Sequence, residues 1–125
     1  MLAGKTIPVV AVGDDDQSIY GWRGARVENI QRFSEDFAGT ETVRLEQNYR
    51  STATILEAAN GLITRNADRL GKNLWTEGER GEPITLYAGF NEQDEARYIV
   101  EQAETWFGDG HPRRSIAILY RSNAQ

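Results

Sequence analysis

The sequence predicts an α/β fold built on a parallel sheet, and three observations support this. Short apolar segments alternate with segments whose apolar residues recur every three or four positions, a pattern typical of strands and helices joined by right-handed crossovers. Polar and aromatic clusters follow two of the expected strands, where open α/β sheets bind ligands. The 125 residues suit one small domain or parts of two.

The first half of the chain contains two expected strands and one expected helix. Residues 7–12 form an apolar run that predicts a buried strand, and a polar loop follows over residues 13–24. A helix is expected over about residues 26–37, and Gly39 ends it. Residues 42–45 predict a short second strand. The apolar residues that predict the helix are Val27, Ile30, Phe33 and Phe37.

The second half repeats this alternation. A helix is expected over about residues 53–66, where Thr54 and Glu57 resemble a capping box and Ser51 is an alternative cap. After a long connection, strands are expected over residues 84–87 and 115–120. Between these strands, Asn91 begins a helix that Gly108 and Gly110 end. The last residues include a cap, Ser122 or Asn123, without a helix after it, so we expect a fragment of a longer protein whose unpaired sheet edges favour self-association.

Composition and charge restrict the classes of function. The chain has no cysteine, which excludes a disulfide framework and a thiolate metal site. It has no apolar run near the roughly 18 residues of a membrane span, and no signal peptide opens it, so we expect a cytoplasmic protein without a membrane partner. The net charge of −5 argues against nucleic-acid binding by bulk electrostatics. Any such binding needs local contacts, namely ring stacking and a few placed arginines.

The loop after the first strand carries side chains suited to two ligands. The amide of Gln17 donates and accepts hydrogen bonds, so it suits a phosphate oxygen or a water beside it. Tyr20 and Trp22 are flat rings of the kind that stack on unpaired bases, and Arg23 suits a phosphate or a ring face. Local packing is an equally good explanation for either ring alone, but the presence of both rings beside Gln17 favours the ligand interpretation.

Three consecutive carboxylates in the same loop, Asp14, Asp15 and Asp16, suit magnesium. The alternative is an aspartate-rich turn whose side chains bond their own backbone, and we favour it for at least two of the three. We therefore predict no metal site. Gly4-Lys5-Thr6 resembles the end of a phosphate-binding loop but lacks the preceding strand and the upstream glycine, so we reject it as a nucleotide site.

The second cluster, residues 47–51, places Tyr49 beside Arg50 just after the second expected strand. An aromatic ring next to an arginine suits a nucleobase and its phosphates. A surface arginine at a helix start is the commoner case, although the helix dipole disfavours a cation there, which suggests a reason for Arg50.

These clusters together resemble the superfamily-1 DNA helicases of the UvrD/Rep/PcrA type, over essentially the whole chain. Residues 13–25, GDDDQSIYGWRGA, resemble helicase motif III almost letter for letter. Residues 45–52, LEQNYRST, resemble motif IV. Residues 72–76, KNLWT, residues 91–92 with 94–96, and residues 118–125, ILYRSNAQ, resemble further family segments.

The resemblance implies a role for each matching residue. Gln17 would contact the ATP γ-phosphate or its attacking water, Tyr49 would stack on adenine, and Arg50 would be the arginine finger. Single-stranded DNA would be held by Tyr20, Trp22 and Arg23 from motif III and by Arg121 and Asn123 from the last segment. The implied activity is ATP-driven movement along single-stranded DNA, 3′ to 5′, in DNA repair.

The resemblance also implies two incomplete RecA-like domains of the P-loop NTPase type. Residues 1–46 would be the C-terminal part of the first domain, and residues 47–125 the N-terminal part of the second. The chain contains neither a complete phosphate-binding loop nor an Asp-Glu-x-x-Asp magnesium motif. We therefore expect ATP and Mg²⁺ to bind only the full-length helicase, and we expect the fragment alone, separated from the rest of its polypeptide, to be inactive. Two alternatives are a stand-alone module that binds single-stranded nucleic acid and a small doubly wound domain with an unrelated metal site at Asp14–Asp16.

Overall fold

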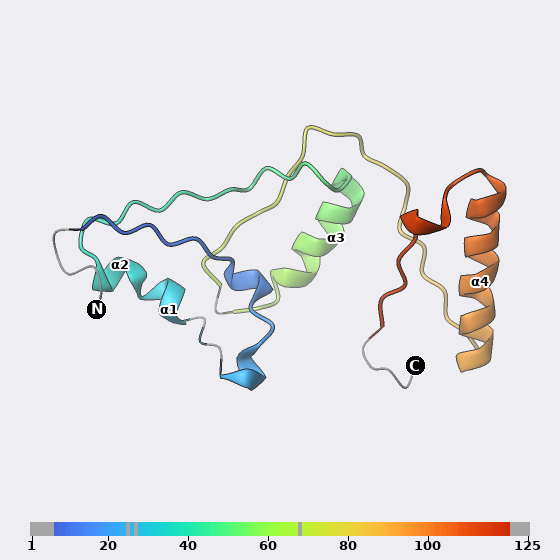
Figure 1. Ribbon diagram of the computed structural model, residues 1–125, viewed down its shortest axis with the longest axis horizontal. Helices are drawn as coiled ribbons and strands as arrows, with labels where there is room; N and C mark the ends of the chain where they lie inside the picture. The colour runs from blue at the N-terminus through green and yellow to red at the C-terminus, as the bar shows by residue number, and fades with distance from the viewer. Residues whose placement is uncertain (1–6, 25, 27, 68, 121–125) are drawn as a thin grey trace. The chain divides into compact units, whose positions relative to one another are not determined.

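The structure is a computed structural model that describes residues 7–24, 26, 28–67 and 69–120 (Figure 1). Its contacts divide the chain into two compact units, residues 1–84 and residues 85–125. The longest helix of the first unit is α3, Ala53–Ile63, and the longest helix of the second is α4, Glu92–Gly108. The described residues also contain two short helices, α1 (Glu28–Gln31) and α2 (Phe33–Asp36), and three 3-10 turns: η1 (Asp15–Gln17), η2 (Gly21–Arg23) and η3 (Arg113–Ser115).

Helix α4 confirms the sequence prediction at both ends. Asn91 is the N-cap, and its side chain accepts a hydrogen bond from the backbone N–H of Asp94 at 2.9 Å. Acidic side chains fill the first turn, where the helix dipole favours negative charge. The preceding segment packs on this turn, since the rings of Tyr87 and Tyr98 stack with centroids 3.9 Å apart. The Tyr87 hydroxyl also donates to Asp94 at 2.9 Å.

Helix α3 begins near the predicted residue, but its N-terminus is satisfied differently. Its N-cap, Thr52, makes no side-chain capping bond, so the expected capping box is wrong. The backbone N–H of Thr54 donates to the carbonyl of Arg80 at 3.0 Å, and the Thr54 hydroxyl donates to the same carbonyl at 2.8 Å. Glu57, the other half of the expected box, pairs with the Arg80 guanidinium at 3.1 Å. A distant stretch of backbone therefore caps this helix.

The single helix expected over residues 26–37 is two short helices, α1 (Glu28–Gln31) and α2 (Phe33–Asp36), with Arg32 between them. Neither helix contains a buried residue. Helices this short depend on an apolar face packed against a partner. Val27, one of the residues on which the expected apolar face depended, lies outside the described residues.

The four expected strands are corrected, because residues 7–12, 42–45, 84–87 and 115–120 form no sheet. The one bridge among the described residues is parallel and joins Gln47 to Trp75. A strand exists only when a neighbour receives its backbone hydrogen bonds, and an isolated pair is marginal in water. The apolar side chains of these segments are accordingly exposed, with Val12 at 93% and Leu86 at 94%.

Little hydrophobic core forms around the helices. Leu56 of α3, at 4% exposure, is the one buried apolar side chain among the residues that the structure describes. The described residues form no sheet, so the expected self-association through sheet edges stays a prediction. No described helix has the length and apolar character that crossing a membrane requires.

Candidate functional site

The loop over residues 13–24 is built from two consecutive 3-10 turns. Asp14 caps η1, since its Oδ1 accepts a hydrogen bond from the backbone N–H of Asp16 at 3.2 Å. Gly24 ends η2 with a φ of 85°, a left-handed conformation that favours glycine. The loop therefore holds Gln17 at the end of the first turn and Trp22 within the second.

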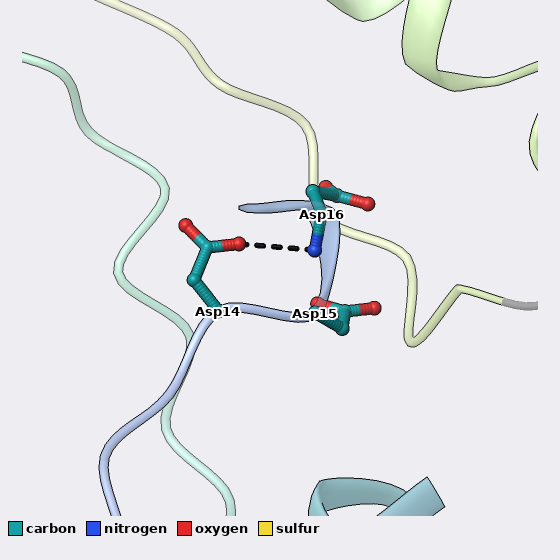
Figure 2. A group of neighbouring side chains, drawn as sticks. All are labelled: Asp14, Asp15 and Asp16. Carbon is teal, nitrogen blue, oxygen red and sulfur yellow. Dashed lines mark hydrogen bonds between the residues drawn. The ribbon is translucent and has the colours of Figure 1, made fainter. Parts of the chain in front are cut away.

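The carboxylates of Asp14, Asp15 and Asp16 form an acidic cluster, with oxygens within 4.8 Å of one another (Figure 2). The segment over residues 69–72 engages all three. Arg69 forms a bidentate ion pair with Asp16, in which Nε donates to Oδ1 at 3.0 Å and Nη2 donates to Oδ2 at 2.7 Å. The backbone N–H of Leu70 donates to Asp15 at 2.7 Å, and Lys72 pairs with Asp14.

The acidic cluster therefore anchors a distant segment of the chain. The local turn was expected for at least two of the three aspartates, and this expectation is wrong, because of the three only Asp14 bonds a nearby backbone N–H, that of Asp16. The carboxylates of Asp15 and Asp16 instead bond residues more than fifty positions away. All three carboxylates thus accept hydrogen bonds from protein donors.

Two pKa shifts follow from these contacts. Partial burial raises the pKa of Asp14, but hydrogen bonds from Lys72 and Gln17 outweigh it, and the net pKa lies below the ordinary value of 3.8. The hydrogen bond to Asp16 raises the pKa of Arg69, which partial burial opposes. The Asp14 carboxylate is therefore charged at neutral pH, and its protonation requires a lower pH than that of an ordinary aspartate.

Gln17 and Arg50 line the same pocket, which has a volume of about 470 Å³. This volume lies within the range of about 300–1,000 Å³ that is typical of small-molecule sites. The Gln17 amide donates from Nε2 to Asp14 Oδ2 at 2.6 Å. Tyr49 and Lys72 also line the pocket, so it combines an amide, a ring and two cationic side chains.

A tight turn presents Arg50 to this pocket. The side-chain oxygen of Asn48 accepts hydrogen bonds from the backbone N–H groups of Arg50 at 2.9 Å and Ser51 at 2.8 Å. The backbone N–H of Asn48 in turn donates to the carbonyl of Trp75 at 2.7 Å. The Arg50 side chain is exposed and forms no ion pair with any described residue, which leaves its guanidinium available to an anion.

Tyr49 projects from the same turn. Its ring is 87% exposed, and its hydroxyl donates to Gln47 Oε1 at 2.8 Å. The hydroxyl bond steadies the ring, and the exposure of the residue suits stacking on a flat ligand.

Tyr20, Trp22 and Arg23 form a second exposed group, which we call the aromatic cluster. Tyr20 is 53% exposed and Trp22 is 81% exposed. The guanidinium carbon of Arg23 lies 5.8 Å from the centroid of the Tyr20 ring and 5.5 Å from that of Trp22. One cation thus bridges two rings, which holds them together at the surface.

The structure brings most, but not all, of the predicted site residues together. Gln17, Tyr49 and Arg50 share the pocket, and the aromatic cluster belongs to the same loop as Gln17. Arg121 and Asn123 lie outside the described residues. Sequence reasoning missed Lys72 and Arg69, because two cations in a long connection give no sign of which carboxylates they meet.

The chain is similar in sequence to known helicases. Residues 43–125 match the UvrD-like helicase C-terminal domain, and residues 1–38 match the UvrD/REP helicase N-terminal domain. DNA helicase II of Escherichia coli is 66% identical over all 125 residues, and that of Salmonella typhimurium is 65% identical. The ATP-dependent DNA helicase PcrA of Staphylococcus epidermidis is 48% identical over the same span. The chain spans 17% of the length of each of these relatives.

Proposed function

The chain belongs to the UvrD-like helicase family, and from this premise we propose that it is part of an ATP-dependent DNA helicase. The full-length protein would couple ATP hydrolysis to movement along single-stranded DNA, 3′ to 5′, in DNA repair. The observation that carries this proposal is the common pocket of Gln17 and Arg50. These residues come from segments more than thirty positions apart and have the chemistry that phosphoryl transfer requires.

The proposed nucleotide site uses the donors that line the pocket. Arg50 would neutralise charge on the transferring phosphoryl group, and Tyr49 would stack on the adenine. Gln17 would contact the γ-phosphate or orient the attacking water. ATP fits this donor set, because an arginine, an amide and an exposed ring suit phosphates, a water and a base respectively.

The magnesium ion that accompanies ATP would be held elsewhere in the full-length protein. Asp14 is the one carboxylate that lines the pocket, and it is already engaged by Lys72 and Gln17. This arrangement agrees with the sequence, which contains no Asp-Glu-x-x-Asp motif. We therefore propose no metal site within this chain.

The proposed DNA site is the aromatic cluster, extended by Arg121 and Asn123 from the end of the chain. The exposure of Trp22 and Tyr20 supports stacking on unpaired bases, and Arg23 would hold the strand beside them. Local contacts of this kind suit a chain whose net charge is −5. Motif III would thus carry a nucleotide contact at Gln17 and a DNA contact three to five residues later.

The proposed domain boundary between residues 46 and 47 lies close to the interval between the two family matches. The N-terminal match ends at residue 38 and the C-terminal match begins at residue 43. Residues 1–46 would then belong to one RecA-like domain and residues 47–125 to the next, with the nucleotide between them. The sheet of each domain would be completed by strands from the rest of the polypeptide, which accounts for the exposed apolar segments. A cytoplasmic location follows from the proposed work on DNA.

A second candidate function is a stand-alone module that binds single-stranded nucleic acid. The aromatic cluster favours it, because Tyr20, Trp22 and Arg23 are exposed together at the surface. The two functions differ in what happens to ATP. A binding module holds DNA and leaves ATP intact, whereas a helicase hydrolyses ATP faster when DNA is present.

ATP hydrolysis by the full-length protein and by the isolated chain, each with and without single-stranded DNA, tests the proposal. We expect DNA-stimulated hydrolysis from the full-length protein and none from the 125-residue chain, which lacks the phosphate-binding and magnesium motifs. DNA binding without hydrolysis by the full-length protein would favour the binding module. Stimulated hydrolysis by the isolated chain would contradict the expected inactivity of the fragment.

A further inference from the structure

We propose that Asp14 is a positioning residue that orients the Gln17 amide, and that Lys72 ties Asp14 to the segment paired with the Arg50 turn. The inference rests on the proposed role of Gln17 in ATP hydrolysis and adds two residues to it. Neither residue would need to touch the nucleotide.

The hydrogen bonds around Asp14 determine how the Gln17 amide lies. Asp14 Oδ2 accepts from Gln17 Nε2 at 2.6 Å, while Oδ1 binds Lys72 and the backbone N–H of Asp16. A carboxylate only accepts hydrogen bonds, so it selects the amide nitrogen of Gln17 and turns the amide oxygen away from itself. That oxygen is then able to accept a hydrogen bond from a water, which is what orienting an attacking water requires.

Lys72 holds its place because its neighbours are anchored. Arg69 grips Asp16 through two hydrogen bonds, and the backbone N–H of Leu70 bonds Asp15. The Arg69 and Asp16 side chains are each only 12% exposed, so solvent screens this ion pair less than a surface pair. Lys72 is thus presented to Asp14 by a segment with its own two attachments to the loop.

Further along the chain, the same segment is hydrogen-bonded to the turn that carries Arg50. Trp75 donates its backbone N–H to the carbonyl of Glu46 at 3.1 Å and accepts from the N–H of Asn48 at 2.7 Å. Asn48 in turn binds the backbone of Arg50. A continuous series of contacts therefore runs from Gln17 through Asp14 and Lys72 to the arginine that lines the same pocket.

Four variants of the full-length protein test this inference: Asp14→Ala, Lys72→Ala, Lys72→Arg and Gln17→Ala. Misplacing a catalytic contact costs about 10²-fold in rate, so we expect kcat to fall by that order in Asp14→Ala. The fall in kcat should be smaller in Lys72→Ala, and Lys72→Arg should recover most of the kcat that Lys72→Ala loses. The affinity for a non-hydrolysable ATP analogue, measured by equilibrium binding, should stay near the wild-type value in the Asp14 and Lys72 variants.

Two comparisons keep the inference falsifiable. Combining Lys72→Ala with Gln17→Ala should lower kcat no further than Gln17→Ala alone, because Lys72 acts on kcat only through the position of Gln17. Arg80→Ala is the matched control, since it removes a cation whose ion pair with Glu57 is exposed and distant in sequence from the loop. It should leave kcat unchanged.

Four results would overturn the inference or its premise, and each is distinct. Weaker binding of the analogue by Lys72→Ala would mean that Lys72 contacts the nucleotide directly. Additive losses in the double variant, or wild-type kcat in both Asp14→Ala and Lys72→Ala, would remove the positioning role while Gln17 keeps its own. Wild-type kcat in Gln17→Ala would instead refute the proposed function of Gln17. Lys72→Ala serves as the test if Asp14→Ala does not fold.

Discussion

Replacing Arg50 with alanine in the full-length protein is expected to abolish most ATP turnover while the protein still binds DNA. An arginine that reaches a transferring phosphoryl group contributes on the order of 10³–10⁵ in rate, so kcat should fall by that factor. The structure supports this size of effect, because Arg50 lines the pocket of Gln17 without an ion pair to any described residue. Steady-state ATPase assays with saturating single-stranded DNA measure the loss.

A lysine variant and a distant arginine provide the controls for this prediction. Arg50→Lys keeps the charge but loses the planar fork of donors, so it should recover only a small part of the rate. Arg80→Ala removes an exposed arginine from another position and should have no effect. Wild-type turnover in Arg50→Ala would show that Arg50 is an ordinary surface arginine, which is the alternative that the sequence left open.

Replacing Trp22 with alanine is expected to weaken the grip on single-stranded DNA. A base stacked on an aromatic side chain is worth about 1–3 kcal/mol, which corresponds to a loss of about 5- to 150-fold in affinity. The Trp22 side chain is 81% exposed and has Arg23 against its ring, so the change removes a ligand surface and little internal packing. Fluorescence anisotropy with a labelled oligonucleotide measures the affinity, and DNA stimulation of ATP hydrolysis should fall with it.

Trp22→Phe and Trp106→Ala are the matched variants for this experiment. Phenylalanine keeps a flat ring and should retain part of the affinity. Trp106 is also exposed, at 50%, but it belongs to α4 and contacts His111, so its removal should leave DNA binding unchanged. Equal losses in Trp22→Ala and Trp106→Ala would point to a general structural effect and against a stacking site.

The helices were predictable where local signals were strong. Asn91 and the acidic turn after it define the start of α4, and Gly108 lies at its end, so local chemistry alone locates this helix. Helix α3 was also predictable, but its cap was not, because the carbonyl that bonds Thr54 belongs to Arg80. The helix expected over residues 26–37 is interrupted at Arg32, and neither of the two short helices that replace it contains a buried residue.

The strands failed for a different physical reason. Apolar, β-branched runs such as residues 7–12 indicate a preference for a sheet, but the sheet itself depends on pairing with other segments. Because no partner strand is present among the described residues, the side chains of Val12 and Leu86 stay exposed. Strand prediction therefore depends on more of the chain than helix prediction does.

The residue types of the candidate site were predictable from the sequence, but some of the contacts between its residues were not. Gln17, Tyr49 and Arg50 were identified from their chemistry and from their positions after expected strands, and they do line one pocket. The pairing of the acidic cluster with Arg69 and Lys72 was not foreseen, since opposite charges more than fifty residues apart have many other partners available. Long-range electrostatic contacts depend on the fold and leave no local pattern.

We propose that motif III couples the nucleotide to the DNA strand, and a measurement of how each ligand changes the affinity for the other tests this coupling. The measurement is the affinity of the full-length protein for single-stranded DNA with and without a non-hydrolysable ATP analogue, in the wild type and in Gln17→Ala. Coupling between two sites typically amounts to about 1–3 kcal/mol, so the analogue should change the wild-type affinity by about 5- to 150-fold. In Gln17→Ala we expect the analogue to change the DNA affinity by a factor of only about one. An equal fold-change in the wild type and in Gln17→Ala would contradict the coupling.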